Sequence, residues 1–530
     1  MPGLSQVDRA IVPPNIVFPQ DYNAAYDLLQ RNLQAGRGDK PAFIDDRGSY
    51  TYNELERRSS AFANVLRDRG VQMEQRILLC LLDSIDFPVV FLGAIKVGVV
   101  PVAVNTLLTP DDYRYMLQDS RAQMLLVSEA LLPLFEPLLD ESSHLKSILV
   151  SGADEQAENS LCAALAASNP ECVIAPTRCD DMCFWLYSSG STGAPKGTVH
   201  KHSSLIQTAE LYARAVLELS EQDIVFSAAK LFFAYGLGNG MTFPMSVGGT
   251  AVLMAERPTP EAVFARLTEH QPTLFFGAPT LFAGMLASAD LPDRDQLSLR
   301  YAVSAGESLP EHLGKRWLEQ FGVDVLDGIG STEMLHIYLS NQPQQTRYGT
   351  TGVPVPGYEL RVVDDDGHTL PPGEIGELQI KGPSSAIFYW NNREKTLATF
   401  NGQWVRSGDK YHQDEDGYFV FHGRSDDMLK VSGIYVSPIE VEAALMTHPA
   451  VLEAAVVGRE DADELVKPAA YVVLQRGHER SEALATALKS HVKTVLAPYK
   501  CPRWFEFVDE LPKTATGKIQ RFKLRQAAAV

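Results

Sequence analysis

The sequence predicts an α/β protein with a large first domain of parallel and mixed sheets covered by helices, which also includes a small β-barrel-like unit, and a small α+β second domain. Three observations predict this fold. Between Arg76 and Glu333, short β-rich runs alternate with helix-like stretches, the pattern of parallel sheets covered by helices. Residues 352–423 are rich in strands and turns. Residues 426–530 alternate between helix and strand in a compact α+β pattern.

The elements can be placed in order along the chain. The strand candidates of the first domain are residues 76–82, 99–104, 124–129, 147–152, 223–229, 250–254, 273–279, 299–307 and 324–330. In the second domain we expect helices at 437–448 and 482–496, and strands at 452–459, 468–475 and 504–511. The polar run Gly423–Asp427 is the best linker candidate, so we predict domains of residues 1–425 and 426–530.

Size and composition restrict the class of protein. A chain of 530 residues is too long for one ordinary core. The start of the chain has no charged stretch followed by an apolar one, and the apolar region Phe87–Val104 is broken by Pro and Gly, so we expect neither a signal peptide nor a membrane span. Six cysteines without a CxxC pair argue against disulfides and zinc, and the expected location is the cytoplasm. The net charge of −19 argues against nucleic acid as a partner.

The run Tyr187–Gly197, YSSGSTGAPKG, follows the apolar stretch Met182–Leu186. Glycines let the backbone bend so that N–H groups converge on an anion, and the hydroxyls and the lysine add donors and positive charge. The predicted phosphate-binding residues are Ser188, Ser189, Gly190, Ser191, Thr192, Gly193 and Lys196. The ordinary P-loop needs Gly before its lysine and Ser or Thr after it, whereas Pro195 and Gly197 stand here, which disfavours a P-loop kinase.

This run resembles the phosphate-binding signature of the adenylate-forming enzymes, the superfamily of acyl-CoA synthetases, adenylation domains and luciferases. Four further segments carry the same resemblance. The first is Asp327–Glu333, DGIGSTE, which we expect as a turn after the strand Val323–Leu326. The resemblance implies that Thr332 and Glu333 serve Mg²⁺ and phosphate, and that Asp327 and Gly328 lie beside the adenine and the acyl pocket. In addition to the four segments, the turn Ala305, Gly306, Glu307 matches the one that flanks the adenine in the family.

Two more signatures are RSGDK, residues 406–410, and the twenty residues 423–442. By resemblance, the carboxylate of Asp409 holds the ribose hydroxyls, a task suited to an acceptor with two oxygens. Arg424 also contacts the nucleotide, and Asp426 is the hinge between the domains. The resemblance further implies that the segment with Lys430, Ser432 and Gly433 lies against coenzyme A in the thioester-forming state.

The last signature is PKTATGKIQR, residues 512–521. By resemblance, Lys518 is the catalytic lysine of adenylation, which reaches the carboxylate oxygen and the α-phosphate. The surrounding segment Lys489–Arg525 carries nine basic residues against three acidic ones. A solvated basic face and a surface that meets polyphosphate are both compatible with this excess.

The run FFAYGLGNG, residues 232–240, is interpreted as part of an acyl pocket rather than as a nucleotide loop. Phe233, Ala234 and Tyr235 would supply its walls, and the glycines would let backbone approach a flat ring. Together with MLHI, residues 334–337, the run looks most like that of the benzoate–CoA ligases. The same resemblance adds Gly328, Ile329, Gly330 and His336 to the aryl site. His336 could donate one hydrogen bond to the acid or could be a packed core histidine.

The hypothesis from sequence is therefore an ATP-dependent acid–thiol ligase that forms benzoyl-AMP and then benzoyl-CoA, with Mg²⁺ as cofactor and ATP and coenzyme A as substrates. Alternatives are a ligase for a hydroxybenzoate, an aminobenzoate, cinnamate or a short aliphatic acid, and an adenylation domain that loads a carrier protein. A non-catalytic relative would need to lack Lys196, Glu333 or Lys518, and all three are present. Small molecules are the expected partners, and a homodimer is one assembly that the sequence leaves open.

Overall fold

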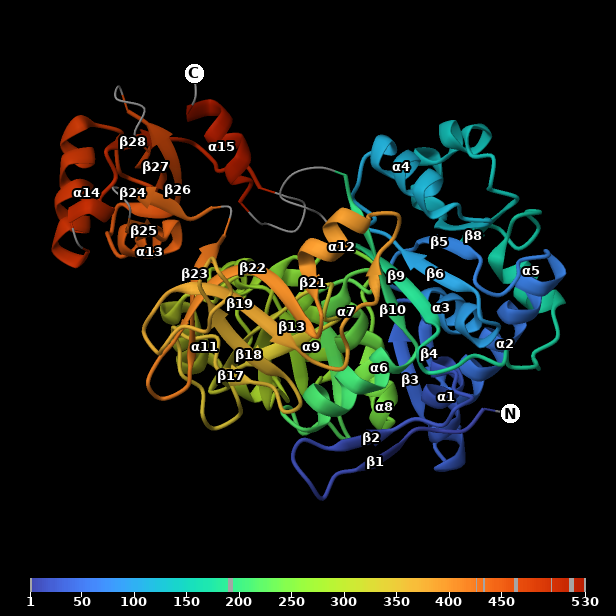
Figure 1. Cartoon of the computed structure of the whole chain (residues 1–530). Coiled ribbons are helices and arrows are strands. Elements are labelled where there is room, and N and C mark those ends of the chain that lie inside the picture. The colour runs from blue at the N-terminus through green and yellow to red at the C-terminus, as the bar shows by residue number, and fades with distance from the viewer. Residues whose placement is uncertain are drawn as a thin grey trace. The chain divides into compact units, whose positions relative to one another are not determined.

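The computed structural model describes residues 2–188, 194–425, 427–431, 434–461, 466–496, 498–513 and 519–528. The chain forms two compact units (Figure 1). The first comprises Met1–Glu359 and Ile380–Val405, and the second Leu360–Gln379 and Arg406–Val530. No helix among the described residues is long and apolar enough to cross a membrane.

A seven-stranded sheet of the first unit carries the start of the predicted phosphate-binding run. Its strands, in spatial order, are β20 (Phe388–Tyr389), β10 (Lys196–Lys201), β9 (Met182–Ser188), β6 (Val100–Ala103), β5 (Arg76–Cys80), β7 (Met124–Ser128) and β8 (Ser147–Ser151). The strands from β9 to β8 are parallel, and β10 and β20 are antiparallel to their neighbours. The sheet is therefore mixed, with its antiparallel edge next to the phosphate-binding run.

The first unit also contains a nine-stranded sheet. Its strands, in spatial order, are β17 (Val353–Pro354), β16 (Ile337–Ser340), β15 (Val325–Gly330), β14 (Tyr301–Ser304), β13 (Leu274–Gly277), β11 (Ile224–Ser227), β12 (Thr250–Val252), β3 (Pro41–Asp45) and β4 (Gly48–Thr51). The strands from β15 to β3 are parallel, and those at both edges are antiparallel. Each of the nine sequence runs predicted as strands of the first domain contains a strand of one of these two sheets.

Helices cover these sheets, and one of them is buried along its whole length. α3 (Asp86–Lys96) has eleven buried residues and packs against α1 (Ala24–Gln34) and α2 (Tyr52–Asp68). Its sequence is apolar almost all round, which is typical of a helix enclosed on every side. Gly93 permits the close approach of α2, because a Cβ there would lie 2.5 Å from the Ser59 carbonyl oxygen. Buried Lys96 donates to the Ser60 hydroxyl and pairs with Glu56.

The remaining elements of the first unit are shorter. They are β1 (Gln6–Asp8), β2 (Asn15–Val17), α4 (Pro110–Ser120), η1 (Glu129–Leu134), η2 (Glu136–Glu141), α5 (Leu161–Ala167), α6 (Ser203–Thr208), η3 (Ala209–Arg214), α7 (Ala234–Leu237), η4 (Gly238–Thr242), α8 (Phe243–Val247), α9 (Pro260–His270), α10 (Pro279–Leu286), η5 (Arg294–Gln296), α11 (Glu311–Phe321), α12 (Arg393–Thr399) and β21 (Phe400–Asn401). Two of them, η3 and η4, are π-helical, and both lie beside the predicted aryl site. π-helical turns are rare and frequently occur at functional sites.

The second unit contains most of a five-stranded sheet together with a small α+β layer. The five strands are β18 (Glu359–Val363), β19 (Gly376–Lys381), β21, β22 (Trp404–Gln413) and β23 (Phe419–Arg424); β21 belongs to the first unit, and β18, β19 and β22 are divided between the units. The α+β part contains β24 (Leu429–Val431), β25 (Ile434–Val436), α13 (Pro438–Met446), β26 (Val451–Glu460), β27 (Val466–Leu474), α14 (Glu482–Val495), η6 (Pro498–Lys500), β28 (Trp504–Phe507) and α15 (Arg521–Ala528). The two helices and three strands predicted for this part occur in the expected order, as α13, β26, β27, α14 and β28, and β24, β25, η6 and α15 are additional.

Candidate active site

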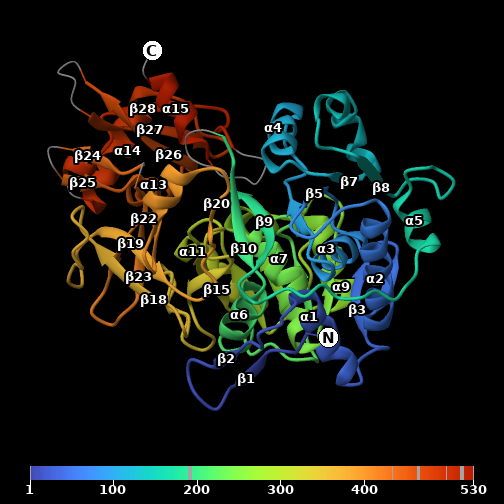
Figure 2. The same ribbon diagram turned by 45° about the vertical axis from the view of Figure 1, so that its right-hand side comes forward.

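The predicted phosphate-binding run connects two neighbouring antiparallel strands. β9 ends at Ser188 and β10 begins at Lys196, and these two residues are partners in the ladder (Figure 2). The strand therefore continues two residues past the expected Leu186, and both ends of the run are held by the sheet. Ser189–Gly193 lie outside the described residues.

Glu333 and Lys196 both contact Tyr389, and Ser188 contacts the same Glu333 carboxylate. The Tyr389 hydroxyl donates to Glu333 Oε1 at 2.7 Å, and Ser188 Oγ lies 3.4 Å from the same oxygen. Lys196 Nζ lies 3.4 Å from the Tyr389 hydroxyl and 4.5 Å from the centre of its ring. The structure thus brings together three residues that the sequence assigned to phosphate and magnesium, and adds a tyrosine that the motifs did not indicate.

The turn that carries Thr332 and Glu333 is fixed through its main chain. His200 Nε2 lies 2.7 Å from the Thr332 carbonyl oxygen, and the Ala386 N–H donates to the Glu333 carbonyl oxygen at 2.8 Å. Burial lowers the pKa of His200 to about 4, so its ring is neutral at pH 7 and donates Nε2–H to that carbonyl. The turn can therefore present the Glu333 carboxylate in a constant direction.

The expectation of a turn over Asp327–Glu333 was partly wrong. β15 extends through Gly330, and the turn begins at Ser331. The two glycines serve the close approach of β16 rather than a bend. A Cβ on Gly328 would lie 3.1 Å from Ile337 Cδ1, and one on Gly330 would lie 2.6 Å from the His336 carbonyl carbon.

The glycine-rich run 232–240 is also not an open loop. Ala234–Leu237 form α7 and Gly238–Thr242 form η4, which continue into α8. Gly236 is required because a Cβ would lie 2.0 Å from the Lys230 carbonyl oxygen. At Gly238 a Cβ would lie 2.4 Å from His336 Cδ2. The flat ring that approaches this glycine is therefore the protein's own imidazole.

His336 is packed among aromatic rings. It is 2 % exposed, and its ring centre lies 4.4 Å from that of Phe243 and 5.6 Å from those of Tyr212 and Tyr235. Its Nε2 lies 3.0 Å from Asn239 Oδ1 and 3.3 Å from the Tyr235 carbonyl oxygen. Two oxygen acceptors around Nε2 require the proton on that atom.

From the sequence, His336 could donate a hydrogen bond to the acid. In the structure its Nε2–H donates within the protein instead. Burial lowers the pKa of His336 to about 3, so the ring is neutral at pH 7. Tyr235 is held in a similar way, because its hydroxyl donates to the Val303 carbonyl oxygen at 3.0 Å. Phe233 and Ala234 lie before and at the start of α7 and are half-buried.

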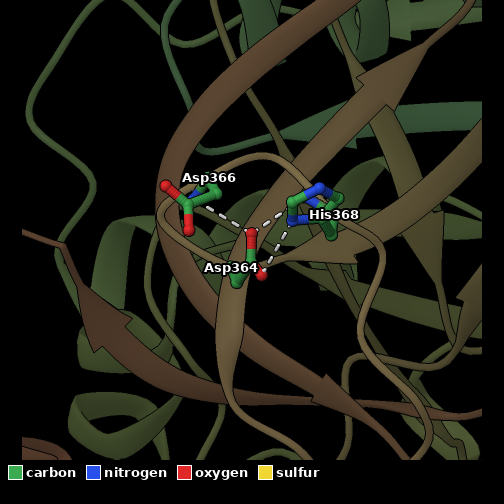
Figure 3. Close-up of side chains that lie close together, drawn as sticks. All are labelled: Asp364, Asp366 and His368. Atoms are coloured by element: carbon green, nitrogen blue, oxygen red, sulfur yellow. Dashed lines mark hydrogen bonds and ion pairs between the residues drawn. The ribbon is translucent and has the colours of Figure 1, made fainter.

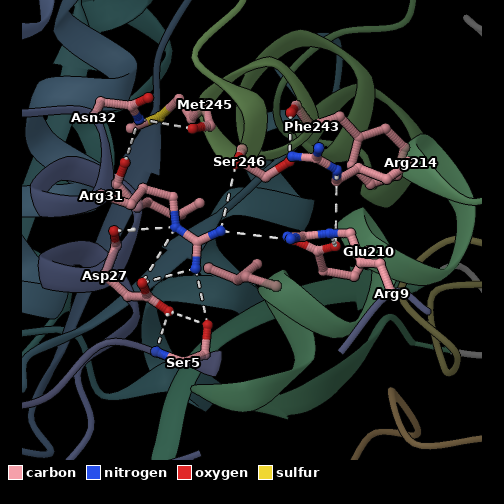
Figure 4. A network of polar contacts seen from close by, with 12 residues as sticks. Ser5, Arg9, Asp27, Arg31, Asn32, Glu210, Arg214, Phe243, Met245 and Ser246 are labelled. Carbon is pink, nitrogen blue, oxygen red and sulfur yellow. Dashed lines mark hydrogen bonds and ion pairs between the residues drawn. The ribbon is translucent and has the colours of Figure 1, made fainter. Parts of the chain in front are cut away.

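A buried charge cluster fixes the π-helix η3, which carries Tyr212 (Figure 4). The side chain of Glu210 is fully buried and accepts from Arg9 at 2.7 and 2.9 Å. Arg31, on α1, lies 3.7 Å from Glu210 and pairs with Asp27 at 2.8 Å. The cluster therefore connects the N-terminal segment to α1 and to the helix behind His336.

The predicted adenine-flanking residues Ala305, Gly306 and Glu307 follow the end of β14, and Asp327 lies within the neighbouring parallel strand β15, opposite Ser304. Ala305 is buried, Gly306 has φ +94°, and Glu307 Oε2 accepts from the Thr280 hydroxyl at 3.1 Å. Asp327 is 5 % exposed, and burial raises its pKa well above the usual range although the Leu309 and Gly328 N–H groups oppose this. In open α/β sheets the carboxyl ends of strands are the usual place of a ligand site.

In the second unit, Asp409 on β22 and Arg424 on β23 are partners in the ladder. Arg424 Nη1 donates to Asp409 Oδ1 at 2.9 Å. Lys430 lies on β24, opposite Tyr435 on β25. Asp426, Ser432, Gly433 and Lys518 lie outside the described residues.

Among the described residues, one group of three titratable side chains has the spacing of a metal site: Asp364, Asp366 and His368, between β18 and β19 (Figure 3). Asp364 Oδ1 accepts the N–H groups of Asp366 at 2.9 Å and His368 at 2.8 Å. His368 Nδ1 lies 3.3 Å from Asp364 Oδ2. These bonds are those of an ordinary acidic turn, and they account for the arrangement without a metal.

Two family descriptions match the chain. Residues 29–390 match the AMP-binding enzyme family, and residues 440–518 match its C-terminal domain. The chain belongs to the AMP-binding enzymes. The resemblance to the adenylate-forming superfamily and the predicted fold class are therefore confirmed.

Individual relatives of this AMP-binding enzyme agree with that assignment. Benzoate–CoA ligase of Thauera aromatica is 63 % identical over 526 residues, which are 99 % of each chain. A solved benzoate CoA ligase from Burkholderia xenovorans LB400 is 56 % identical, with a TM-score of 0.89 over 95 % of this chain and 100 % of that one. The anthranilate CoA ligase AuaEII, solved with anthranoyl-AMP, is 43 % identical, with a TM-score of 0.91 over 97 % of this chain and 98 % of the other.

Sequence reasoning missed Tyr389, Asn239 and Tyr212. Tyr389 is separated by 56 residues from Glu333 and by 193 from Lys196, so no local spacing could reveal it. Asn239 lies between two glycines of the glycine-rich run, and nothing in that pattern indicates that its side chain accepts a hydrogen bond from His336. For Tyr212 the sequence offers no signal that separates it from a core aromatic residue.

Proposed function

We propose that this AMP-binding enzyme activates benzoate with ATP and transfers the benzoyl group to coenzyme A. The observation that carries the choice of acid is the neutral aromatic setting of His336, which donates its ring proton to Asn239 and so offers no charge to a substituent. The 63 % identity to a benzoate–CoA ligase along nearly the whole chain supports the same acid. Ring acids with one small substituent are the nearest competitors.

In the first half-reaction, a carboxylate oxygen of benzoate attacks the α-phosphorus of ATP and pyrophosphate leaves. In the second, the sulfur of coenzyme A attacks the acyl carbon, AMP leaves with the C–O electron pair, and the thiol proton passes to solvent. The protein's part is to position the reactants and to stabilise charge. We assign the phosphates to the run from Ser188 to Lys196, the ribose to Asp409, and the attacking oxygen and α-phosphate to Lys518.

The donors around Glu333 fit Mg²⁺. The carboxylate is grouped with the hydroxyls of Ser188 and Tyr389, and Mg²⁺ prefers oxygen ligands of this kind. We propose that Glu333, with Thr332 beside it, holds Mg²⁺ together with the phosphates. When bound, the ion would neutralise phosphate charge. The side chains themselves bind and orient the triphosphate.

We further propose that residues 426–530 form a mobile domain that turns about Asp426. This movement would withdraw Lys518 after adenylation and bring Lys430, Ser432 and Gly433 to coenzyme A. One pocket could then serve both steps, as lid and domain closures do in other enzymes.

The test is pyrophosphate release with a panel of acids, followed by detection of the thioester. We expect kcat/KM to be higher for benzoate than for 4-hydroxybenzoate, 2-aminobenzoate, cinnamate and hexanoate. A misfit of one methylene in a packed pocket typically costs about 1–3 kcal/mol, or about tenfold or more in rate. If kcat/KM for cinnamate or hexanoate exceeds that for benzoate by about tenfold, the assignment of benzoate as the substrate is wrong. Thioester formation on a holo-carrier protein instead of coenzyme A would indicate an adenylation domain.

A further inference from the structure

Tyr389 links the two charged residues of the candidate phosphate site. Its hydroxyl donates to Glu333 Oε1 at 2.7 Å and accepts from Lys196 Nζ at 3.4 Å. Tyr389 is 2 % exposed, so its ring and hydroxyl are held inside the protein while Glu333 and Lys196 remain half-buried. A donor that itself accepts from a cation is polarised, which strengthens the bond it makes to the carboxylate.

The position of Tyr389 is determined by its surroundings. β20 pairs with β10, where Tyr389 is opposite Thr198. The Tyr389 N–H donates to Thr396 Oγ1 at 3.1 Å, which connects it to α12. The ring packs edge-on against Phe400, with 5.3 Å between the centres. The hydroxyl therefore stands at a fixed place relative to the turn of Glu333.

We propose that Tyr389 is a positioning residue that holds the Glu333 carboxylate in the orientation in which it takes up Mg²⁺ with ATP. This inference rests on the proposed function, which assigns Mg²⁺ to Glu333. A carboxylate bonded at one oxygen loses rotational freedom before the ion arrives. The remaining acceptor positions of the carboxylate, which has about four lone-pair sites, suffice for a metal ion.

The deciding variant is Tyr389→Phe, which removes the hydroxyl and keeps the ring beside Lys196. The measurement is calorimetric binding of ATP, without any acid, over a series of MgCl₂ concentrations. Because a hydrogen bond to a charged group contributes on the order of 1.5–3 kcal/mol, we expect the Mg²⁺ concentration for half-maximal ATP binding to rise about tenfold or more. ATP binding without Mg²⁺ should change less than about twofold, since Lys196 keeps its cation–π contact.

A matched control is Tyr358→Phe. The Tyr358 hydroxyl lies 2.7 Å from Ser384 Oγ, which donates to the Met334 carbonyl oxygen at 2.7 Å. This variant also removes a buried tyrosine hydroxyl that supports the same turn. Unlike the Tyr389 hydroxyl, the Tyr358 hydroxyl does not contact the Glu333 carboxylate. We expect a similar loss of thermal stability and an unchanged Mg²⁺ requirement.

An unchanged Mg²⁺ requirement in folded Tyr389→Phe, or an equal rise in Tyr358→Phe, overturns the proposal. If Tyr389→Phe does not fold, the same Mg²⁺ titration is carried out on Phe400→Leu. This variant loosens the packing of the Tyr389 ring without removing the Tyr389 hydroxyl. The proposal then requires a smaller rise, of about two- to threefold, in the Mg²⁺ requirement. Benzoyl-AMP formation by the unaltered enzyme is measured separately. If the unaltered enzyme forms no benzoyl-AMP, the proposed function is wrong, whereas the role of Tyr389 is still decided by the Mg²⁺ titration of ATP binding.

Discussion

Arg424 donates to Asp409 across the β22–β23 ladder at 2.9 Å. The Asp409 side chain is 7 % exposed, whereas that of Arg424 is 53 % exposed. The sequence assigned both residues to the nucleotide from motifs fifteen positions apart, and the sheet makes them neighbours. The arginine therefore orients a largely buried carboxylate.

Replacing Asp409 with Ala should raise KM for ATP. If the carboxylate accepts from ribose hydroxyls, the loss of charge-assisted bonds of about 1.5–3 kcal/mol corresponds to about a 10- to 100-fold increase. Steady-state kinetics at saturating benzoate measure it. Asp509→Ala is the control, because it removes an exposed partner of Arg480 in the same unit. If the Asp409→Ala enzyme has the same KM for ATP and the same kcat as the parent, Asp409 does not bind the ribose.

A second prediction concerns the proton shared by His336 and Asn239. Asn239→Leu keeps the approximate volume but removes the acceptor, so a buried N–H loses a partner at 3.0 Å. We expect kcat/KM for benzoate to fall about two- to tenfold, because the N–H keeps only the Tyr235 carbonyl oxygen at 3.3 Å and the loss of one hydrogen bond costs about 0.5–1.5 kcal/mol. Asn239→Asp keeps an acceptor and adds a negative charge, which should raise the pKa of His336 from about 3.

The pH profile of kcat/KM distinguishes these two variants. Asn239→Asp should acquire a new ionisation on the acid side, and Asn239→Leu should lower the rate without one. Ser340→Ala, which removes a hydroxyl 3.3 Å from that of Tyr212, serves as a control nearby. If Asn239→Leu matches the parent for benzoate, then the hydrogen bond to His336 has no part in the acid site.

Replacing Glu210 should lower the free energy of unfolding and should affect the catalytic rate less. Its side chain is fully buried between Arg9 and Arg31, and removing one partner of a buried ion pair typically costs about 3–5 kcal/mol. We expect Glu210→Leu to lower the free energy of unfolding by roughly that amount. Denaturant unfolding measures this, with Glu141→Leu, which removes an exposed partner of Arg114, as the control. Equal stability of the two variants would contradict the prediction.

Asp83 gives a prediction on pH. Its carboxylate accepts the Leu231 N–H at 3.1 and 3.2 Å, next to the predicted aryl segment. Burial raises its pKa from 3.8 to about 6, although Lys230 and that N–H oppose the change. Because the pKa in the folded protein is the higher one, the contribution of Asp83 to stability is complete below pH 3.8 and is lost as the pH rises through about 6.

The difference in unfolding free energy between the parent and Asp83→Asn isolates this group. It should fall by about 3 kcal/mol between pH 3 and pH 7 and stay constant above. Asp46→Asn, at an exposed partner of Arg266, should show no such trend. A difference that does not change with pH would mean that Asp83 titrates alike in the folded and unfolded chain.

The sequence predicted the strands well and the glycines poorly, for a physical reason. The positions of the strands along the chain follow from the alternation of apolar runs, which is a local property. The reason for a glycine lies in the atom that approaches it, and for Gly238 that atom belongs to His336. Likewise, Tyr389 reaches Glu333 only because β20 pairs with β10, which no spacing reveals.

The most decisive prediction separates the two half-reactions. Lys518 is proposed to act only while benzoyl-AMP forms, so Lys518→Ala should lose adenylation by about 10²–10³-fold or more, as enzymes do on losing a donor aimed at developing charge. Supplied with benzoyl-AMP and coenzyme A, the same variant should form benzoyl-CoA at nearly the parent rate. Pyrophosphate release measures the first step and thioester absorbance the second.

Asp426→Pro is the complementary variant, because proline restricts φ at the proposed hinge. It should form the adenylate normally and the thioester slowly, the reverse of Lys518→Ala. Lys513→Ala, at a neighbour paired with Glu453 at 2.6 Å, is the control for loss of a lysine from the same segment. If Lys518→Ala is equally impaired in both steps, the lysine shapes the site throughout. A domain that turns between the steps is then no longer needed to explain how one pocket serves both.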